Sequence, residues 1–117
     1  MTHQIPPEWL DQAGLRHFTP KTEWYSTHDE KTCDMVIVPI GEIAPLIRAT
    51  GTPAFDHDRM LSVLRAIRDD VVLPPIAVYA LPKEGYRFRI AHGVHRYYAS
   101  ATLGFSKIPA EVWPHEF

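Results

Sequence analysis

The sequence lacks several features that mark particular classes of protein. Its 117 residues include a single cysteine, so no disulfide can form within the chain. No apolar run approaches the roughly 20 residues of a membrane-spanning helix, and the N-terminus lacks the basic and apolar regions of a signal peptide. Lys and Arg number 12 against 14 Asp and Glu, which argues against binding nucleic acid through bulk positive charge. These absences favour a cytoplasmic protein with no membrane partner.

The composition that is present fits one globular domain. Apolar residues make up 45% and charged residues 22% of the chain, as in ordinary globular proteins. The 11 prolines are spread along the chain, which favours short elements joined by many loops. Residues 1–34 are polar, carry scattered aromatics and show no sustained period. We expect them to form an N-terminal extension that packs on the core, with a short helix from Pro6 to near Gly14, and residues 35–117 to form the domain.

Hydrophobic periodicity predicts the elements of this domain. Asp56 is a suitable N-cap for a helix over 57–69, in which Met60, Val63, Leu64 and Ile67 recur at helical spacing. Residues 41–50 form either a short helix or a loop. The other predicted elements are a strand at 35–40, a hairpin with strands 76–81 and 86–91, a helix at 94–103 and a strand at 108–113. This order predicts an α+β (mixed α/β) fold: a small mixed sheet with a β-hairpin and two or three helices.

Residues 92–97 are the most informative stretch of the chain. Gly93 stands where a strand gives way to a helix, and glycine lets the backbone approach a ligand closely. The first turn of a helix directs unpaired N–H groups outward, which favours an anion. His95 and Arg96 add side-chain donors at the same place. The combination predicts a phosphate site and therefore a nucleotide.

The position of Arg96 supports this interpretation, although a simpler one is open. A cation in the first turn of a helix opposes the macrodipole, at a cost of about 0.3–1 kcal/mol if exposed. Such an arginine is easier to understand when it faces an anion. The alternative is that Arg96 points into water or pairs with Asp69, Glu84 or Glu111.

No metal site is predicted. His92 and His95 have the spacing of two helical ligands, but no cysteine or carboxylate at ligand spacing joins them. With seven histidines in the chain, chance proximity is the better interpretation. Asp56, His57 and Asp58 could hold a cation, but a helix cap explains them more simply.

Several motifs occur in an order that resembles a known family. They are Leu73-Pro74-Pro75-Ile76-Ala77-Val78, the hairpin, Ala91-His92-Gly93-Val94-His95-Arg96-Tyr97-Tyr98-Ala99, Leu103-Gly104 and Ile108-Pro109-Ala110-Glu111-Val112. Over about residues 36–113 the chain resembles the ParB/sulfiredoxin-like family. The resemblance implies a domain that binds ATP or CTP with Mg²⁺ and that could hydrolyse the nucleotide or transfer its phosphate.

The same resemblance implies which residues would do this. Gly93 and the start of the helix at Val94, together with His95 and Arg96, would hold the nucleotide phosphates. Arg59 falls where sulfiredoxin has a nucleotide-contacting lysine. Ser62 falls on a nucleotide-contacting serine. Some family members use an acidic residue in the region of Glu42 as a base in phosphoryl transfer, which makes Glu42 the candidate catalytic residue.

Departures from the family pattern narrow the function. Val94 stands where sulfiredoxin has its catalytic cysteine, and Cys33 is far away in sequence, so sulfinic acid reductase activity is not expected. Ala66 replaces a hydroxyl residue expected at the nucleotide. His95 replaces one of two adjacent arginines of the ParB segregation proteins. Those proteins also continue into a helix-turn-helix domain for which this chain has no residues, so a CTP-gated clamp on DNA is not expected.

Two other hypotheses remain beside the nucleotide-binding one. The first is a ParB-like DNA-binding protein or nuclease, against which the net charge of −2 counts. The second is a non-catalytic interaction module, in which residues 1–34 dock a protein partner or a second copy of the chain.

Overall fold

The computed structural model describes residues 5–27, 35–44, 56–83 and 86–113. The described chain has the α+β fold with a small mixed sheet that the sequence pattern predicts. Its elements, in chain order, are α1 (Pro7–Gln12), β1 (Met35–Pro39), the 3₁₀ turn η1 (Ile40–Glu42), β2 (Ile43–Ala44), α2 (His57–Arg68), β3 (Ile76–Lys83), β4 (Tyr86–His92), α3 (Val94–Leu103) and β5 (Lys107–Trp113).

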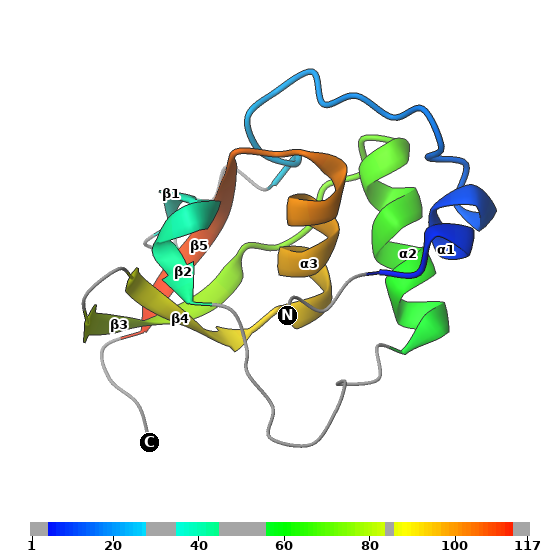
Figure 1. The fold of residues 1–117 in the computed structure, drawn as a ribbon. Coiled ribbons are helices and arrows are strands. Elements are labelled where there is room, and N and C mark those ends of the chain that lie inside the picture. The colour runs from blue at the N-terminus through cyan, green and yellow to red at the C-terminus, as the bar shows by residue number, and fades with distance from the viewer. Residues whose placement is uncertain (1–4, 28–34, 45–55, 84–85, 114–117) are drawn as a thin grey trace.

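The sheet has five strands in the order β1-β5-β3-β4-β2. Strand β1 pairs antiparallel with β5, and β3 pairs antiparallel with β4 as the predicted hairpin. Strands β3 and β5 are parallel, as are β2 and β4. All three helices lie on one side of this sheet, with α2 between α3 and α1 (Figure 1).

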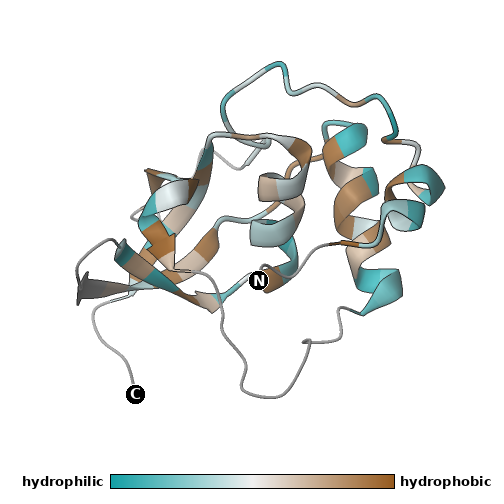
Figure 2. Ribbon diagram, viewed as in Figure 1, coloured by the Kyte–Doolittle hydropathy of each residue, from teal (hydrophilic) through white to brown (hydrophobic). Residues whose placement is uncertain are grey.

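Helix α2 forms where its caps and its apolar spacing predict. The Asp56 carboxylate accepts a hydrogen bond from the backbone N–H of Arg59 at 2.8 Å, which confirms the predicted N-cap. Met60, Leu64 and Ile67 are buried in the core, and brown apolar segments mark the corresponding ribbon (Figure 2). The helix ends with Asp70 in the left-handed region at φ 58°, where glycine is usual. Hydrogen bonds from Asp70 N to Ile67 O and from Val71 N to Ala66 O close this end.

The segment after β1 differs from the prediction. Residues 41–50 were expected to form a helix or a loop, but Ile43 and Ala44 pair with Phe88 and Arg89 as the edge strand β2. A strand of two residues is too short to show a period of two, so the pattern carried no signal for it. Residues 45–50 lie outside the described part of the chain.

The described N-terminal residues share the core of the domain. Ile5, Ala13, Leu15 and Tyr25 are buried in the same cluster as the apolar residues of α2. Helix α1 ends before Gly14, whose φ of 77° suits a glycine after a helix. The predicted boundary between residues 34 and 35 remains a prediction, and Cys33 lies outside the described residues. Within the described ranges, no helix has the length and apolarity needed to cross a membrane.

Candidate functional site

The turn between β4 and α3 requires a glycine. Gly93 is the N-cap of α3 and has φ 105° and ψ 31°, in the left-handed region. A Cβ atom at this position would lie 2.6 Å from Cγ2 and 2.8 Å from Cβ of Ile76. The bare backbone of Gly93 therefore packs directly on the first residue of β3. This contact fixes where the first turn of α3 begins.

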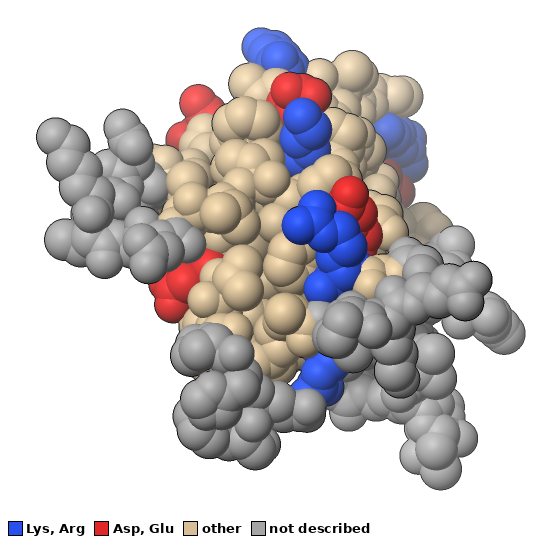
Figure 3. Space-filling view, turned by 90° about the vertical axis from the view of Figure 1, so that its left-hand side faces the viewer, with Lys and Arg blue, Asp and Glu red and all other residues tan. Residues whose placement is uncertain are grey.

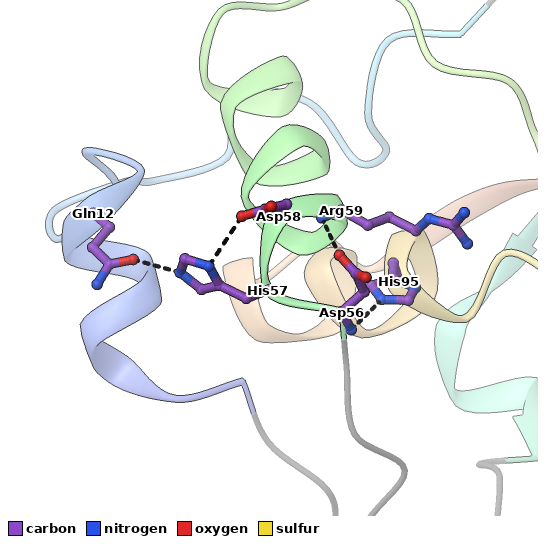
Figure 4. A network of polar contacts seen from close by, with 6 residues as sticks. All are labelled: Gln12, Asp56, His57, Asp58, Arg59 and His95. Atoms are coloured by element: carbon purple, nitrogen blue, oxygen red, sulfur yellow. Dashed lines mark hydrogen bonds and ion pairs between the residues drawn. The ribbon is translucent and has the colours of Figure 1, made fainter.

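The beginning of α3 meets the beginning of α2. The backbone N–H of Asp56, the N-cap of α2, donates a hydrogen bond to Nε2 of His95 at 3.1 Å. His95 belongs to the first turn of α3, and Figure 4 shows its ring beside Asp56 and Arg59. Each helix N-terminus carries roughly half a positive charge. The fold thus brings two such ends together around one imidazole ring.

The surroundings of His95 favour the neutral form of its ring. Burial lowers the pKa of His95, the Arg59 guanidinium lowers it further, and the Asp56 carboxylate opposes both. A ring nitrogen that accepts a hydrogen bond carries no proton. The Asp56 N–H bond therefore assigns the proton of the neutral ring to Nδ1.

Arg96 binds backbone carbonyls of the loop before β3, and Glu84, one of the acids considered as its partner, lies outside the described residues. The Nη1 of Arg96 donates to the backbone oxygens of Pro74 at 2.6 Å and Pro75 at 3.0 Å. Asp69, one of the acids considered as its partner, instead pairs with Arg68. A guanidinium has five N–H donors, so two bonds from Nη1 leave donors on Nε and Nη2. Arg96 thus ties α3 to the loop before β3 and keeps a capacity to bind an anion.

Tyr25 completes this cluster, and it was not among the site residues predicted from the sequence. Its side chain is 2% exposed, and its hydroxyl donates to the Pro74 oxygen at 2.7 Å. Burial raises the pKa of Tyr25, and the nearby Arg96 guanidinium partly opposes this increase. The Pro74 carbonyl therefore accepts from both Tyr25 and Arg96. The one available signal was the Pro74-Pro75 pair, whose carbonyls precede the strand and need donors from elsewhere.

Arg59 and Ser62 are exposed residues of α2. They are three residues apart, so their side chains lie on the same side of the helix. The Arg59 side chain extends on the side of α2 that holds His95 (Figure 4). On the other side of the same helix start, His57 contacts Gln12 at 2.8 Å and Asp58 at 3.3 Å. The two histidines therefore attach the start of α2 to different helices.

Glu42 is not brought together with the other predicted site residues. Its carboxylate forms an ion pair with Arg87 at 3.1 Å, and Arg87 is the second residue of β4. Gly93 follows the last residue of the same strand, about 20 Å away at roughly 3.3 Å per residue. The catalytic role of Glu42 remains a prediction.

Two known kinds of structure share this fold. The C-terminally truncated chromosome-partitioning protein ParB from Caulobacter crescentus, crystallised with CTP-gamma-S, aligns with a TM-score of 0.55 and 22% identity. The alignment covers 70% of this chain and 45% of that one, so this chain spans less than half of that ParB chain. Sulfiredoxin from Arabidopsis thaliana aligns with a TM-score of 0.53 and 26% identity, over 69% of this chain and 85% of that one.

The sequence itself defines the family. A comparison with curated proteins finds no match. The family described as ParB N-terminal domain, however, matches residues 25–115, which is most of the chain. This match begins at Tyr25 and includes α2, the Gly93 turn and all five strands. The chain belongs to the ParB N-terminal domain family.

Proposed function

We propose that the start of α3 binds the phosphates of a nucleoside triphosphate, CTP or ATP. The observation that carries this proposal is the hydrogen bond between Asp56 N–H and His95, because it joins the N-terminal ends of two helices. Both helix ends carry partial positive charge, which the capping Asp56 carboxylate partly offsets at α2, and the Arg59 guanidinium lies beside them. The CTP-gamma-S in the Caulobacter ParB structure supports a nucleotide as the ligand.

Each residue has a separate role in this proposal. Gly93 supplies the left-handed turn that packs on Ile76 and sets the start of α3, and the N–H groups of Val94 and His95 in its first turn face the phosphates. Arg96 supplies charge-assisted hydrogen bonds from the donors that the proline carbonyls do not use. Arg59 and Ser62 add donors from α2. Neutral His95 donates from Nδ1 while its Nε2 keeps the two helices together.

Mg²⁺ would enter with the nucleotide. Among the described residues no three His, Cys, Asp or Glu side chains are grouped so that they could hold a metal ion. Mg²⁺ commonly binds substrate phosphates and waters with only one or two carboxylates, so this site is compatible with the ion as part of the nucleotide complex. Hydrolysis or phosphoryl transfer depends mainly on positioning and charge neutralisation. Hydrolysis of the bound nucleotide is a separate proposal. It is tested by measuring the release of phosphate from CTP and from ATP.

Isothermal titration calorimetry tests the binding proposal. CTP, ATP and GTP are titrated, with and without Mg²⁺, into the wild type and into Arg96→Ala. We expect Arg96→Ala to weaken binding by about tenfold or more, because a charged donor to phosphate is lost. Arg65→Ala is the matched control, since Arg65 is an exposed arginine of the last turn of α2, away from the helix start. No binding by the wild type at millimolar nucleotide would refute the proposal.

DNA is a second candidate ligand, suggested by one of the structures that share this fold. A second ParB structure from Caulobacter crescentus, complexed to the centromeric parS site, aligns with a TM-score of 0.54 and 22% identity, but this chain covers 41% of it. On the sheet side of the molecule, basic and acidic side chains lie next to one another on a largely uncharged surface (Figure 3). The ion pairs Arg87–Glu42 and Lys107–Glu23 add to this mixture. A mobility shift of duplex DNA at low salt that disappears at high salt would support a DNA ligand.

A further inference from the structure

We propose that Tyr25 is a positioning residue of the candidate site. Its hydroxyl and the Pro74 carbonyl together hold the Arg96 guanidinium in the orientation that the phosphates need. This inference rests on the proposed function, and it adds a residue that lies 71 positions before Arg96 in sequence. Tyr25 does not touch the nucleotide in this proposal, because it acts through Arg96.

The first argument is the shared acceptor. Tyr25 Oη donates to Pro74 O at 2.7 Å, and Arg96 Nη1 donates to the same oxygen at 2.6 Å. The second donor of Nη1 goes to Pro75 O at 3.0 Å. Two fixed carbonyls and the adjacent tyrosine leave the planar guanidinium little freedom to rotate. Its Nη2 lies 3.2 Å from the position that a Cβ of Gly93 would occupy, so the group lies against the turn that begins α3.

The second argument is burial. Tyr25 is 2% exposed, so water cannot replace its hydrogen bond. Burial also raises the pKa of its hydroxyl, which therefore remains a donor throughout the neutral range. A buried tyrosine that donates a hydrogen bond to the carbonyl shared with Arg96 holds that carbonyl in place more firmly than solvent would.

The third argument is that Tyr25 is itself held in place. The backbone oxygen of the next residue, Ser26, accepts a hydrogen bond from the Leu73 N–H at 2.9 Å. Thr27 forms a parallel bridge with Leu73. These contacts fasten the segment to the residues immediately before Pro74. The orientation of Arg96 therefore depends on the docking of the N-terminal segment.

Tyr25→Phe is the direct test, because it keeps the buried ring and removes only the hydroxyl. Its matched control is Ser26→Ala. This variant removes the hydrogen bond between the Ser26 hydroxyl and Asp70, keeps the backbone bond from Leu73 N–H to Ser26, and leaves the side chains of Tyr25 and Arg96 unchanged. Binding of CTP and of inorganic tripolyphosphate is measured by calorimetry for both variants, for Arg96→Ala and for the Tyr25→Phe/Arg96→Ala double variant. Tripolyphosphate isolates the phosphate part of the ligand.

We expect Tyr25→Phe to raise the Kd for both ligands about fivefold, the usual effect of one hydrogen bond. Ser26→Ala should leave both Kd values within about twofold. In the Arg96→Ala background Tyr25→Phe should have no further effect, because a residue that acts through Arg96 has nothing left to position. A merely structural role of Tyr25 would instead weaken binding in both backgrounds.

The outcomes separate this inference from the proposed function. If the wild type binds and Arg96→Ala does not, but Tyr25→Phe binds like the wild type, the positioning role is wrong and the site stands. If the wild type binds neither ligand, both proposals are wrong. The ¹⁵Nε–¹Hε resonance of Arg96 gives a readout without ligand: it should shift or broaden in Tyr25→Phe and stay in place in Ser26→Ala. An unchanged resonance in Tyr25→Phe contradicts the inference.

Discussion

The N–H of Asp56 donates a hydrogen bond to Nε2 of His95 across the space between α2 and α3. The two residues are 39 positions apart, and each stands at the beginning of its helix. The bond requires the neutral imidazole, because a protonated Nε2 would present a hydrogen to the Asp56 N–H. The junction between the two helices is therefore sensitive to pH.

We predict that protonation of His95 destabilises the protein. The pKa of His95 in the folded state lies below its ordinary value of 6.5, mainly because of burial and then because of Arg59. The unfolded chain therefore binds this proton more readily than the folded one. The stability contributed by neutral His95 is complete above pH 6.5 and decreases as the pH falls below it, until the folded-state pKa is passed.

Urea denaturation at pH 7.5, 6.5 and 5.5 measures this effect. His95→Gln retains an acceptor but cannot be protonated, so its free energy of unfolding should decrease less on acidification than that of the wild type. The other six histidines are present in both proteins, so the difference between the two belongs to His95. Equal pH dependence in the two proteins would contradict the prediction.

Gly93→Ala should destabilise the protein by about 2–5 kcal/mol. The left-handed φ of 105° costs an L-residue roughly 1–2 kcal/mol. The new Cβ, 2.6 Å from Ile76 Cγ2, adds roughly 1–3 kcal/mol of overpacking. Gly41→Ala is the control, because no atom lies within 4 Å of a Cβ at that position. Chemical denaturation should show a large loss in the first variant and little change in the second.

Arg96→Ala should cost about 1–3 kcal/mol of stability even without ligand. The Pro75 carbonyl loses its donor, and the Pro74 carbonyl keeps only Tyr25. Arg96→Lys should recover only part of the loss, because a flexible ammonium lacks the rigid planar geometry that directs the two Nη1 hydrogens at both oxygens. In thermal unfolding, the wild type should have the highest Tm, Arg96→Lys an intermediate one and Arg96→Ala the lowest. An alanine variant as stable as the wild type would show that these hydrogen bonds contribute nothing.

Alkaline unfolding provides a test of Tyr25. Because burial raises its pKa above the ordinary value of 10, the stability that its protonated form contributes is present below pH 10 and is lost at higher pH. The free energy of unfolding of Tyr25→Phe should therefore decrease less than that of the wild type between pH 9.5 and 11.5. Tyr97, whose pKa is also raised mainly by burial, is present in both proteins and cancels in the comparison. A wild type and variant that lose stability in parallel would argue against a buried, protonated Tyr25.

Local signals in the sequence determined most of the secondary structure. Asp56 marks the start of α2 because a carboxylate can accept the helix's own N–H groups. Gly93 and Gly104 bracket α3 because both adopt left-handed backbone angles that other residues resist. Alternation along 86–91 predicted β4 because successive side chains of a strand face opposite sides. Each of these signals depends only on neighbours within a few residues. The motifs that follow Leu73 further indicated the family, because their order and spacing record the whole topology.

The tertiary structure alone decided what the site residues contact. No local pattern relates Arg96 to the carbonyls of Pro74 and Pro75, or either of them to Tyr25, because backbone oxygens have no sequence signature. The same limit hid the Asp56–His95 bond, which exists only because α2 and α3 pack with their N-termini together. It also hid the position of Glu42, which the parallel pairing of β2 with β4 places far from Gly93. Which residue types begin a helix follows from local chemistry, whereas what meets at that helix start follows from how the chain packs.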